Sequence, residues 1–305
     1  MRVRDFGSPK IRQEKIGLCA LNAKGKALLL GGTMKIKIVI PMHNFGELTD
    51  RCIETIQKNA GIDHEILVVD DLSDIPYKND KVSVIRLKEH SGYTKATNLG
   101  LRFLRLDYDY VLLLNNDTLP QPDFLKNLVE RAESDKGIGI VGSTRINAWE
   151  PYREAGPGLD LTTGLVQYVK DPEEWKEPMQ CIWMPFCSAL LSRACVEYVG
   201  LLDEKMITHC SDNDYCLRSI FMGFGIVVEP RSKVFHYQSV TVNSLALEPY
   251  DDQITFAKKW FAPAMNEILR AIPINYEMKK WGIMGFRYEI KDDSVGDEKR
   301  IVLAR

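Results

Sequence analysis

The chain has 305 residues, of which 45% are hydrophobic and 27% are charged, and its formal net charge is -2. This length supports one large α/β domain or two small ones, with a substantial buried core. The charge balance lacks the excess of basic residues that is typical of nucleic-acid binding. We therefore expect no nucleic-acid partner.

The seven cysteines show no CxxC spacing and lie mostly in apolar stretches. Buried free thiols of this kind are typical of a reducing compartment. No apolar run approaches the roughly 18 residues of a membrane span, and the N-terminus lacks the apolar region of a secretory signal. The expected localisation is cytoplasmic, with peripheral contact at the inner face of the membrane left open. The sequence does not indicate the oligomeric state.

Residues 1–33 carry seven Lys or Arg against one Asp and one Glu, and glycines interrupt any long periodic pattern. This composition predicts a basic, flexible N-terminal extension that can contact anionic lipid or a partner. A second interpretation is that Gly31-Gly32-Thr33-Met34 represents a translated ribosome-binding sequence followed by a start codon. The natural chain is then expected to begin at Met34.

From Lys35 onward, short β-branched runs alternate with amphipathic helices, which is the pattern of βαβ units. The fold class is therefore α/β, with a Rossmann-like, mostly parallel sheet and helices on both faces. We expect a catalytic domain over residues 34–245 and a C-terminal helical tail over 246–305. The predicted strands cover residues 36–40, 65–70, 81–87, 110–114, 137–141 and 226–229. The predicted helices cover residues 47–59, 94–105, 122–134, 212–222 and 250–260. Residues 149–178 are expected to form a loop or small hairpin.

Polar residues follow the first two strands, at the same predicted edge of the sheet. Pro41-Met42-His43-Asn44 follows the first strand, and Asp70-Asp71 follows the second. Ligands of open parallel sheets bind beyond the carboxyl ends of the strands, and a carboxylate there can accept a hydrogen bond from a pyrimidine imide. This edge therefore predicts a nucleoside pocket. The alternative for Asp70-Asp71 is a turn with a helix-capping carboxylate.

The segment from His90 to Asn98 opens a helix with Gly92 and small polar residues. Backbone N–H groups at such a position, together with Lys95, can face a diphosphate. The alternative is an ordinary capped helix with a solvent-facing Lys95.

Asn115-Asn116-Asp117 ends the strand over 110–114, whose continuous apolar character predicts burial on both faces. A hard divalent cation prefers oxygen ligands, usually one or two carboxylates completed by phosphate and water. Asp117 is therefore a candidate metal ligand beside a bound diphosphate, and the two asparagine amides can hold a ribose hydroxyl or a water. The alternative is an Asx turn leading to Pro120.

Asp212 and Asp214 lie in the first turn of a predicted helix. One of them can project into a cleft as a general base, while the other fixes the helix start and pairs with Arg218. Capping by negative charge explains both residues equally well. His236 follows a strand-like run, where a lone histidine is more often structural than a metal ligand.

Seven segments occur in an order that resembles the family 2 inverting glycosyltransferases with the GT-A fold, particularly bacterial polysaccharide and rhamnosyltransferase-like members. The resemblance extends from Ile36 to Trp260. The segments are IVIPMHN, EILVVDDLSD, HSGYTKATNLGL, YVLLLNNDTLPQPDFL, FCSALLSRACVEYVGLLDE, SDNDYCLR and VFHYQS.

The resemblance implies one role for each part of the predicted site. The first motif and the paired aspartates contact the nucleoside, the helix start lies by the donor, and the asparagine-rich corner is the DxD-type motif. An aspartate then serves as the general base for the acceptor, and a histidine adds a metal ligand. The residues are Pro41, His43, Asn44, Asp70 and Asp71 for the nucleoside, Lys95 and Asn98 for the donor, Asn115, Asn116 and Asp117 for the motif, Asp212 for the base and His236 for the metal.

Two departures from the family pattern affect the expected metal site. Asn115 and Asn116 replace residues that are often Asp, and Ser211 stands where Glu commonly precedes the base. Fewer carboxylates weaken intrinsic metal binding, so Mn²⁺ or Mg²⁺ is expected to arrive mainly with the nucleotide sugar.

The resulting hypothesis is metal-assisted sugar transfer, with inversion, from a UDP, dTDP or GDP sugar to a hydroxyl of a glycan, lipid-linked or protein acceptor. A degenerate nucleotide-sugar binder or scaffold is the alternative, which Asn115, Asn116 and Ser211 keep open. A sugar nucleotidyltransferase needs a Gly-rich basic loop just after the first strand, which Pro41-Met42-His43-Asn44 does not supply. A dehydrogenase needs GxGxxG after an early strand, and no early strand is followed by it.

Overall fold

The chain divides into two compact units, residues 1–34 and 35–305. In the first, β1 (Ala20–Leu21) pairs with β2 (Ala27–Leu28) in antiparallel register, and the rest of the predicted basic extension lies outside the described residues. The computed structural model describes residues 20–21, 27–28, 34–147, 155–159, 166–169, 176–237, 250–260, 281–283, 286–291 and 300–303.

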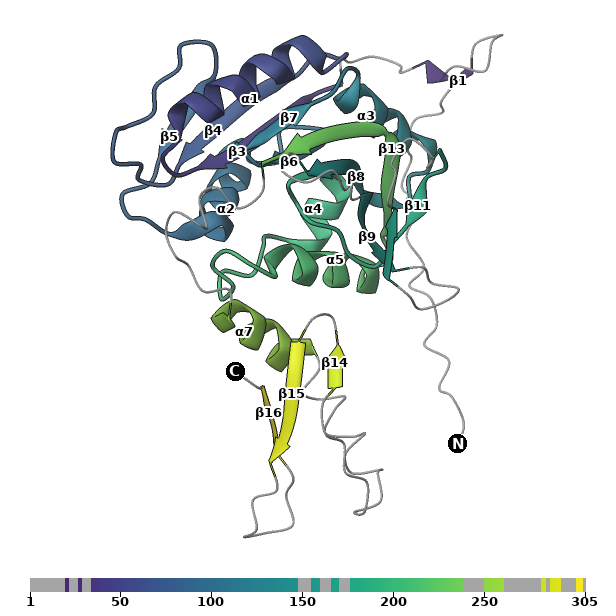
Figure 1. Ribbon diagram of the computed structural model, residues 1–305. Helices are drawn as coiled ribbons and strands as arrows, with labels where there is room; N and C mark the ends of the chain where they lie inside the picture. Colours follow the sequence, from purple (N-terminus) through teal and green to yellow (C-terminus); the bar gives the residue numbers. More distant parts are fainter. Residues whose placement is uncertain are drawn as a thin grey trace. The chain divides into compact units, whose positions relative to one another are not determined.

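A nine-stranded sheet forms the centre of the second unit (Figure 1). Its strands follow the order β11-β13-β8-β12-β6-β3-β4-β5, and β7 pairs with β13 off this path. The strands are β3 (Ile36–Met42), β4 (Glu65–Asp70), β5 (Ser83–Arg86), β6 (Tyr110–Leu114), β7 (Thr118–Pro120), β8 (Ile138–Asn147), β11 (Met179–Gln180), β12 (Ser188–Ser192) and β13 (Gly225–His236).

One strand in the middle of the sheet is reversed relative to its neighbours. Strands β5, β4, β3 and β6 are mutually parallel, whereas β12 runs antiparallel to both β6 and β8. Strand β13 is in turn parallel to β8, so β12 is a single reversed strand within a mostly parallel sheet. The predicted α/β class is confirmed. Strand β12 was not among the strands predicted from the sequence, and its direction depends on where the preceding connection enters the sheet.

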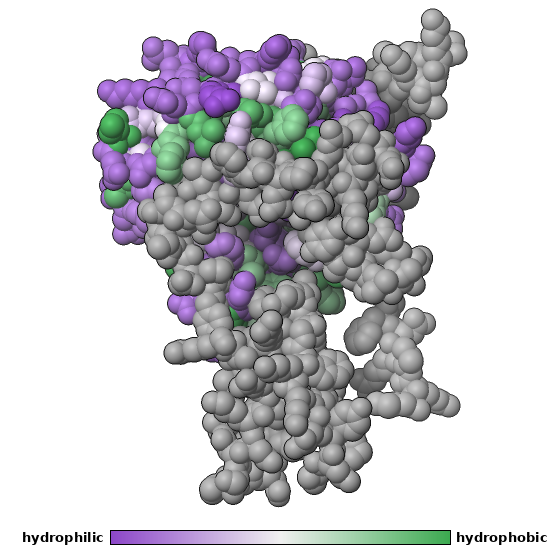
Figure 2. Space-filling view, in the orientation of Figure 1, coloured by the Kyte–Doolittle hydropathy of each residue, from purple (hydrophilic) through white to green (hydrophobic). Residues whose placement is uncertain are grey.

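Helices cover both faces of the sheet, as predicted. Figure 1 shows α1 and α3 on one face and α2, α4 and α5 on the other. Val39 and Val69 join α2, α4 and α5 in one buried cluster, and a Cβ at Gly100 of α2 would lie 2.5 Å from Val39 Cγ1. The outer surface around α1 is mostly hydrophilic (Figure 2). The helices are α1 (Gly46–Asn59), α2 (Gly92–Leu104), α3 (Phe124–Ser134), α4 (Arg193–Val199), α5 (Ser211–Phe221) and α7 (Tyr250–Trp260).

Strand β13 is longer than the predicted strand over 226–229. It continues to His236 with a register shift between Glu229 and Lys233. Pro230 lies at this shift, and a proline in a sheet is tolerated at a bulge. The prediction ended the strand early because proline normally interrupts one.

Two other segments differ in detail from the sequence-based expectation. Strand β9 (Ala155–Leu159) pairs with β10 (Val166–Val169), which agrees with a small hairpin within 149–178; the intervening residues lie outside the described part. The C-terminal tail contains not only the helix α7 but also a three-stranded antiparallel sheet of β14 (Trp281–Ile283), β15 (Phe286–Lys291) and β16 (Arg300–Leu303). No helix among the described residues has both the length and the hydropathy needed to cross a bilayer.

Candidate functional site

A pocket of about 220 Å³ opens at the carboxyl ends of β3, β4 and β6, beside the end of β13 and the start of α5. This is where the sequence placed the ligand site, because polar residues follow each of these strands. The structure brings eight of the predicted site residues to the pocket wall, namely Pro41, His43, Asp71, Asn115, Asn116, Asp117, Asp212 and His236.

Asp117 and His236 form one corner of this pocket. The pairing of β7 with β13 brings them together, because Thr118 lies opposite His236 and Tyr237 N donates to Asp117 O at 2.9 Å. Each residue is 6% exposed, and His236 Nε2 lies 3.1 Å from Asp117 Oδ1. The Nδ2 atom of Asn115 lies 3.4 Å from the same ring nitrogen.

The buried atoms of this corner suit a shared cation. Within the described residues, Asp117 Oδ1 and Asn115 Oδ1 are buried without a hydrogen-bond partner. An oxygen and a ring nitrogen that face each other are suitable ligands for a divalent metal, although a protonated His236 would form an ion pair instead. The described residues contain no group of three or more His, Cys, Asp or Glu that could hold a metal.

Helix α1 fixes the backbone of the asparagine-rich corner. Asn116 Nδ2 donates to Thr49 Oγ1 at 3.1 Å, and Thr118 Oγ1 donates to Asn115 O at 2.8 Å. Cys52 Sγ also contacts Asn115 O at 3.7 Å. These contacts hold the turn after β6 while Asp117 lines the pocket.

Asp212 lies on the pocket wall in the first turn of α5. Burial raises the pKa of its carboxyl group, and backbone hydrogen bonds, including one from Asn213 N at 2.8 Å, only partly oppose this effect. Burial also raises the pKa of the nearby Cys187 thiol to about 11, with contributions from the charges of Asp117 and Asp212. The negative charges of Asp117 and Asp212 therefore both reach the part of the pocket that Cys187 lines.

Asp70 does not line the pocket but organises the loop after β4. It is fully buried, accepts hydrogen bonds from Ser73 N (2.8 Å) and Tyr77 N (3.1 Å), and pairs with Arg86. Burial alone would raise the pKa of Asp70, but these hydrogen bonds outweigh it and lower the pKa. A direct nucleoside contact by Asp70 stays a prediction.

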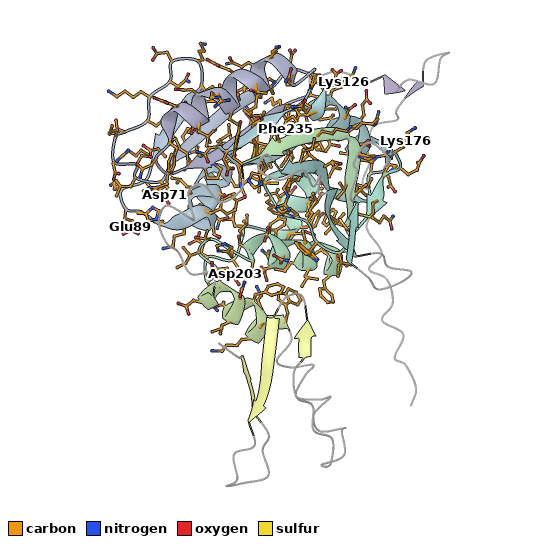
Figure 3. The ribbon with its side chains drawn as sticks, in the orientation of Figure 1. Asp71, Glu89, Lys126, Lys176, Asp203 and Phe235 are labelled. Carbon is orange, nitrogen blue, oxygen red and sulfur yellow. The ribbon has the colours of Figure 1, made fainter. Side chains whose placement is uncertain are left out.

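The start of α2 is engaged with the protein itself. Asp71 accepts hydrogen bonds from Ser91 N (2.8 Å) and Gly92 N (2.7 Å), and Figure 3 shows Asp71 beside this helix. Thr94 N donates to Ile207 O at 3.0 Å. These amides were expected to face a diphosphate; in the structure they donate to Asp71 and to Ile207 O, and the Ser91 side chain makes no cap hydrogen bond. Diphosphate binding at this helix start stays a prediction.

Three more predicted residues lie outside the pocket lining. Lys95 is exposed, and Asn44 donates to Asp74 at 3.2 Å. Asn98 is fully buried and bonds to Leu202 and Glu204 in the segment after α4. The donor contacts expected for Lys95, Asn98 and Asn44 stay predictions.

Several pocket residues had no individual role assigned from the sequence, although Met42, His90, Gly92 and Ser211 lie in segments that it singled out. His90 lies beside His43 with ring centroids 4.2 Å apart, and both Nδ1 atoms contact Asp71 O, at 3.3 Å and 2.7 Å respectively. His209 lies three residues before Asp212, and its place among only five histidines was the available signal. The other new lining residues are Met42, Gly92, Tyr93, Ala96, Pro185, Phe186, Cys187, Thr208 and Ser211.

The first part of the chain matches a known protein family. Residues 37–170 match Glycosyl transferase family 2. The dTDP-rhamnosyl transferase RfbF of Shigella flexneri is 22% identical over 177 residues, which cover 56% of this chain and 59% of that protein. The O-antigen biosynthesis protein RfbC of Myxococcus xanthus is 21% identical over 258 residues, which cover 76% of this chain and 20% of that protein. The chain thus spans less than two thirds of the length of either relative.

Comparison with solved structures identifies the fold. The crystal structure of GalNAc-T7 with UDP, GalNAc and Mn²⁺ superposes with a TM-score of 0.59 at 16% identity, covering 79% of this chain and 52% of that one. At this identity the likeness concerns the fold alone. Residues 37–170 therefore match glycosyltransferase family 2, and the chain has the GT-A fold that the order of its sequence motifs predicted.

Proposed function

We propose that this protein transfers a sugar from a nucleoside diphosphate sugar to an acceptor hydroxyl, with inversion at the anomeric carbon. The match to family 2 supports sugar transfer. The observation that carries the proposal is the pocket itself, in which the Asp117 and His236 pair and the carboxylate of Asp212 line one cavity. Such a cavity can hold a leaving group and an attacking hydroxyl together.

In this mechanism Asp212 accepts the proton of the acceptor hydroxyl as its oxygen attacks the anomeric carbon. Its raised pKa suits this role, because a carboxylate with a higher pKa is a stronger base. A single displacement of this kind inverts the configuration. General-base assistance typically contributes about 10² to 10⁴ in rate.

Asp117 and His236 would hold a divalent cation, with Asn115 beside them. A bound Mn²⁺ or Mg²⁺ supplies charge stabilisation to the departing diphosphate. The unpartnered oxygens of Asp117 and Asn115 support this assignment. Binding of Mn²⁺ by the structural neighbour GalNAc-T7 is consistent with it.

The names of the relatives suggest which substrates to test first. RfbF is a dTDP-rhamnosyl transferase, and GalNAc-T7 was solved with UDP. We therefore propose dTDP and UDP sugars as donors before GDP sugars. RfbC belongs to O-antigen biosynthesis, so a growing or lipid-linked saccharide, met at the inner face of the membrane, is the proposed acceptor.

Replacement of the proposed base tests this function. We expect Asp212→Asn to reduce kcat by about 10² to 10⁴ while calorimetry shows unchanged affinity for dTDP or UDP with Mn²⁺. Asp251→Asn removes an exposed carboxylate from α7 and should leave kcat unchanged. Near-normal transfer by Asp212→Asn would exclude this residue as the base.

The non-catalytic alternative makes a different prediction. Asn115, Asn116 and Ser211 replace carboxylates that family members often carry, and this is the observation in its favour. A nucleotide-sugar binder should bind dTDP or UDP yet neither hydrolyse nor transfer from any donor in Mn²⁺. Slow hydrolysis that is lost in Asp212→Asn would exclude it.

A further inference from the structure

Asp252, in the first turn of α7, binds three consecutive backbone amides of the loop that precedes α5. Its Oδ1 accepts a hydrogen bond from Ile207 N at 2.7 Å, and its Oδ2 accepts from Thr208 N and His209 N, each at 2.7 Å. Asp252 is only 7% exposed. Hydrogen bonds to a carboxylate are roughly twice as strong as neutral ones, so this residue holds the loop firmly.

This loop is part of the pocket wall. Thr208 and His209 line the pocket together with Asp212, and α5 begins at Ser211. Cys210, at the start of α5, has a left-handed φ of 61° and makes no side-chain cap hydrogen bond. The start of the helix that carries Asp212 therefore depends on how the preceding loop is held.

The opposite side of the loop packs closely against α2. Thr94 N donates to Ile207 O at 3.0 Å, and Gly92 approaches with a φ of +81°. A Cβ at Gly92 would lie 2.4 Å from Ile207 Cγ2 and 2.9 Å from Ile207 O. The loop is thus fixed between α2 on one side and the Asp252 carboxylate on the other.

We propose that Asp252 is a positioning residue for the transfer reaction. It touches no substrate and acts through the loop of residues 207–210, which sets His209 and the first turn of α5, and hence Asp212, against the pocket. The proposal rests on the proposed function, in which Asp212 receives the acceptor proton. In this proposal α7 contributes to catalysis by positioning the loop, and is not a separate C-terminal tail.

The other end of α7 supplies a matched control. Lys259 Nζ lies 2.7 Å from Asp203 Oδ2 and 2.7 Å from Asp214 Oδ1, and Figure 3 shows Asp203 next to this helix. Lys259→Met removes these ion pairs but none of the bonds to the loop amides. Asp214 keeps its bonds to Arg218 and Trp260 in this variant.

The experiment compares wild type, Asp252→Asn and Lys259→Met. It measures amide hydrogen exchange at residues 207–209, affinity for dTDP and UDP with Mn²⁺, and hydrolysis of whichever dTDP or UDP sugar the wild type cleaves. In Asp252→Asn we expect roughly tenfold faster exchange, because an amide side chain cannot accept from all three donors. Turnover should fall by about 100-fold, as expected for a displaced catalytic group, with unchanged nucleotide affinity.

Lys259→Met should lose thermal stability yet keep wild-type exchange at the loop and wild-type turnover. Equal loss of turnover in both variants would show a merely structural role for α7 and overturn the proposal, as would wild-type turnover in Asp252→Asn. If Asp252→Asn does not fold, unprotected amides at residues 207–209 in the wild type would overturn it directly. A wild type that cleaves no donor contradicts the proposed function instead, while the exchange comparison still tests the attachment of the loop.

Discussion

Two carboxylates near the pocket, Asp70 and Asp212, respond to burial in opposite ways. Burial disfavours the charged form of both. Asp70 receives hydrogen bonds that outweigh this effect and lower its pKa, whereas burial dominates at Asp212 and raises its pKa. Asp70 therefore stabilises the fold in its ionised form, and Asp212 retains the proton affinity that a base requires.

The raised pKa of Asp212 predicts a cost in stability at neutral pH. Burial raises the pKa of Asp212 in the folded state above the reference value of 3.8. The free energy of unfolding therefore falls as the pH rises from 3.8 through the folded-state pKa, because the folded state resists ionisation. We expect Asp212→Asn to raise the midpoint of denaturant unfolding near neutral pH and to have no such effect below pH 3.8. An unchanged or lower midpoint near neutral pH would contradict the dominance of burial.

At the scale of elements, α2 packs on the sheet through the backbone of Gly100. A Cβ there would lie 2.5 Å from Val39 Cγ1 and 3.2 Å from Val69 Cγ2. Both valines belong to the core of the parallel half of the sheet. This contact sets the distance between α2 and β3, and so the position of the helix that flanks the pocket.

Gly100→Ala therefore tests this packing through the sign of the change in the free energy of unfolding. In an exposed helix interior this change stabilises by about 1 kcal/mol. Here we expect overpacking to destabilise by about 1–3 kcal/mol, measured by denaturant unfolding. Lys95→Ala, on the exposed side of the same helix, should change stability by less than about 0.5 kcal/mol. Stabilisation by Gly100→Ala would show that the helix can move away from the sheet at little cost.

The sequence predicted the parallel strands and their helices well, because period and composition are local properties. It did not predict the direction of β12 or the short strand β7, which depend on partners distant in the chain. The same difference between local and distant determinants applies to the residues that line the pocket. Residues directly after strands were found from the sequence, whereas Thr208 and His209 lie in a loop whose amides bond to Asp252 of α7, far along the chain.

At the scale of the whole molecule, the pocket predicts that metal and nucleotide stabilise the fold together. In the proposed site Asp117 and His236 would supply only two ligands, so Mn²⁺ alone should bind weakly and leave the unfolding midpoint almost unchanged. Mn²⁺ with dTDP or UDP at about 100 times the dissociation constant should add about 2.7 kcal/mol. Thermal unfolding measures this coupling.

His236→Ala and chelation by EDTA provide the controls for this experiment. Both should remove the part of the nucleotide-dependent stabilisation that needs Mn²⁺. An equal midpoint shift for the nucleotide with and without Mn²⁺ would show that Asp117 and His236 have a purely structural role.

The reversed strand β12 also determines the order in which the sheet can be completed. It separates β6 from β8, although β8 comes earlier in the chain. During synthesis the apolar edge of β6 thus stays unpaired until residues 115–187 have been made and β12 has emerged. An open apolar edge is a site for pairing with other chains, so this interval is when the nascent protein is most prone to aggregate. The strand that brings Phe186 and Cys187 to the pocket is therefore also the one that closes the sheet.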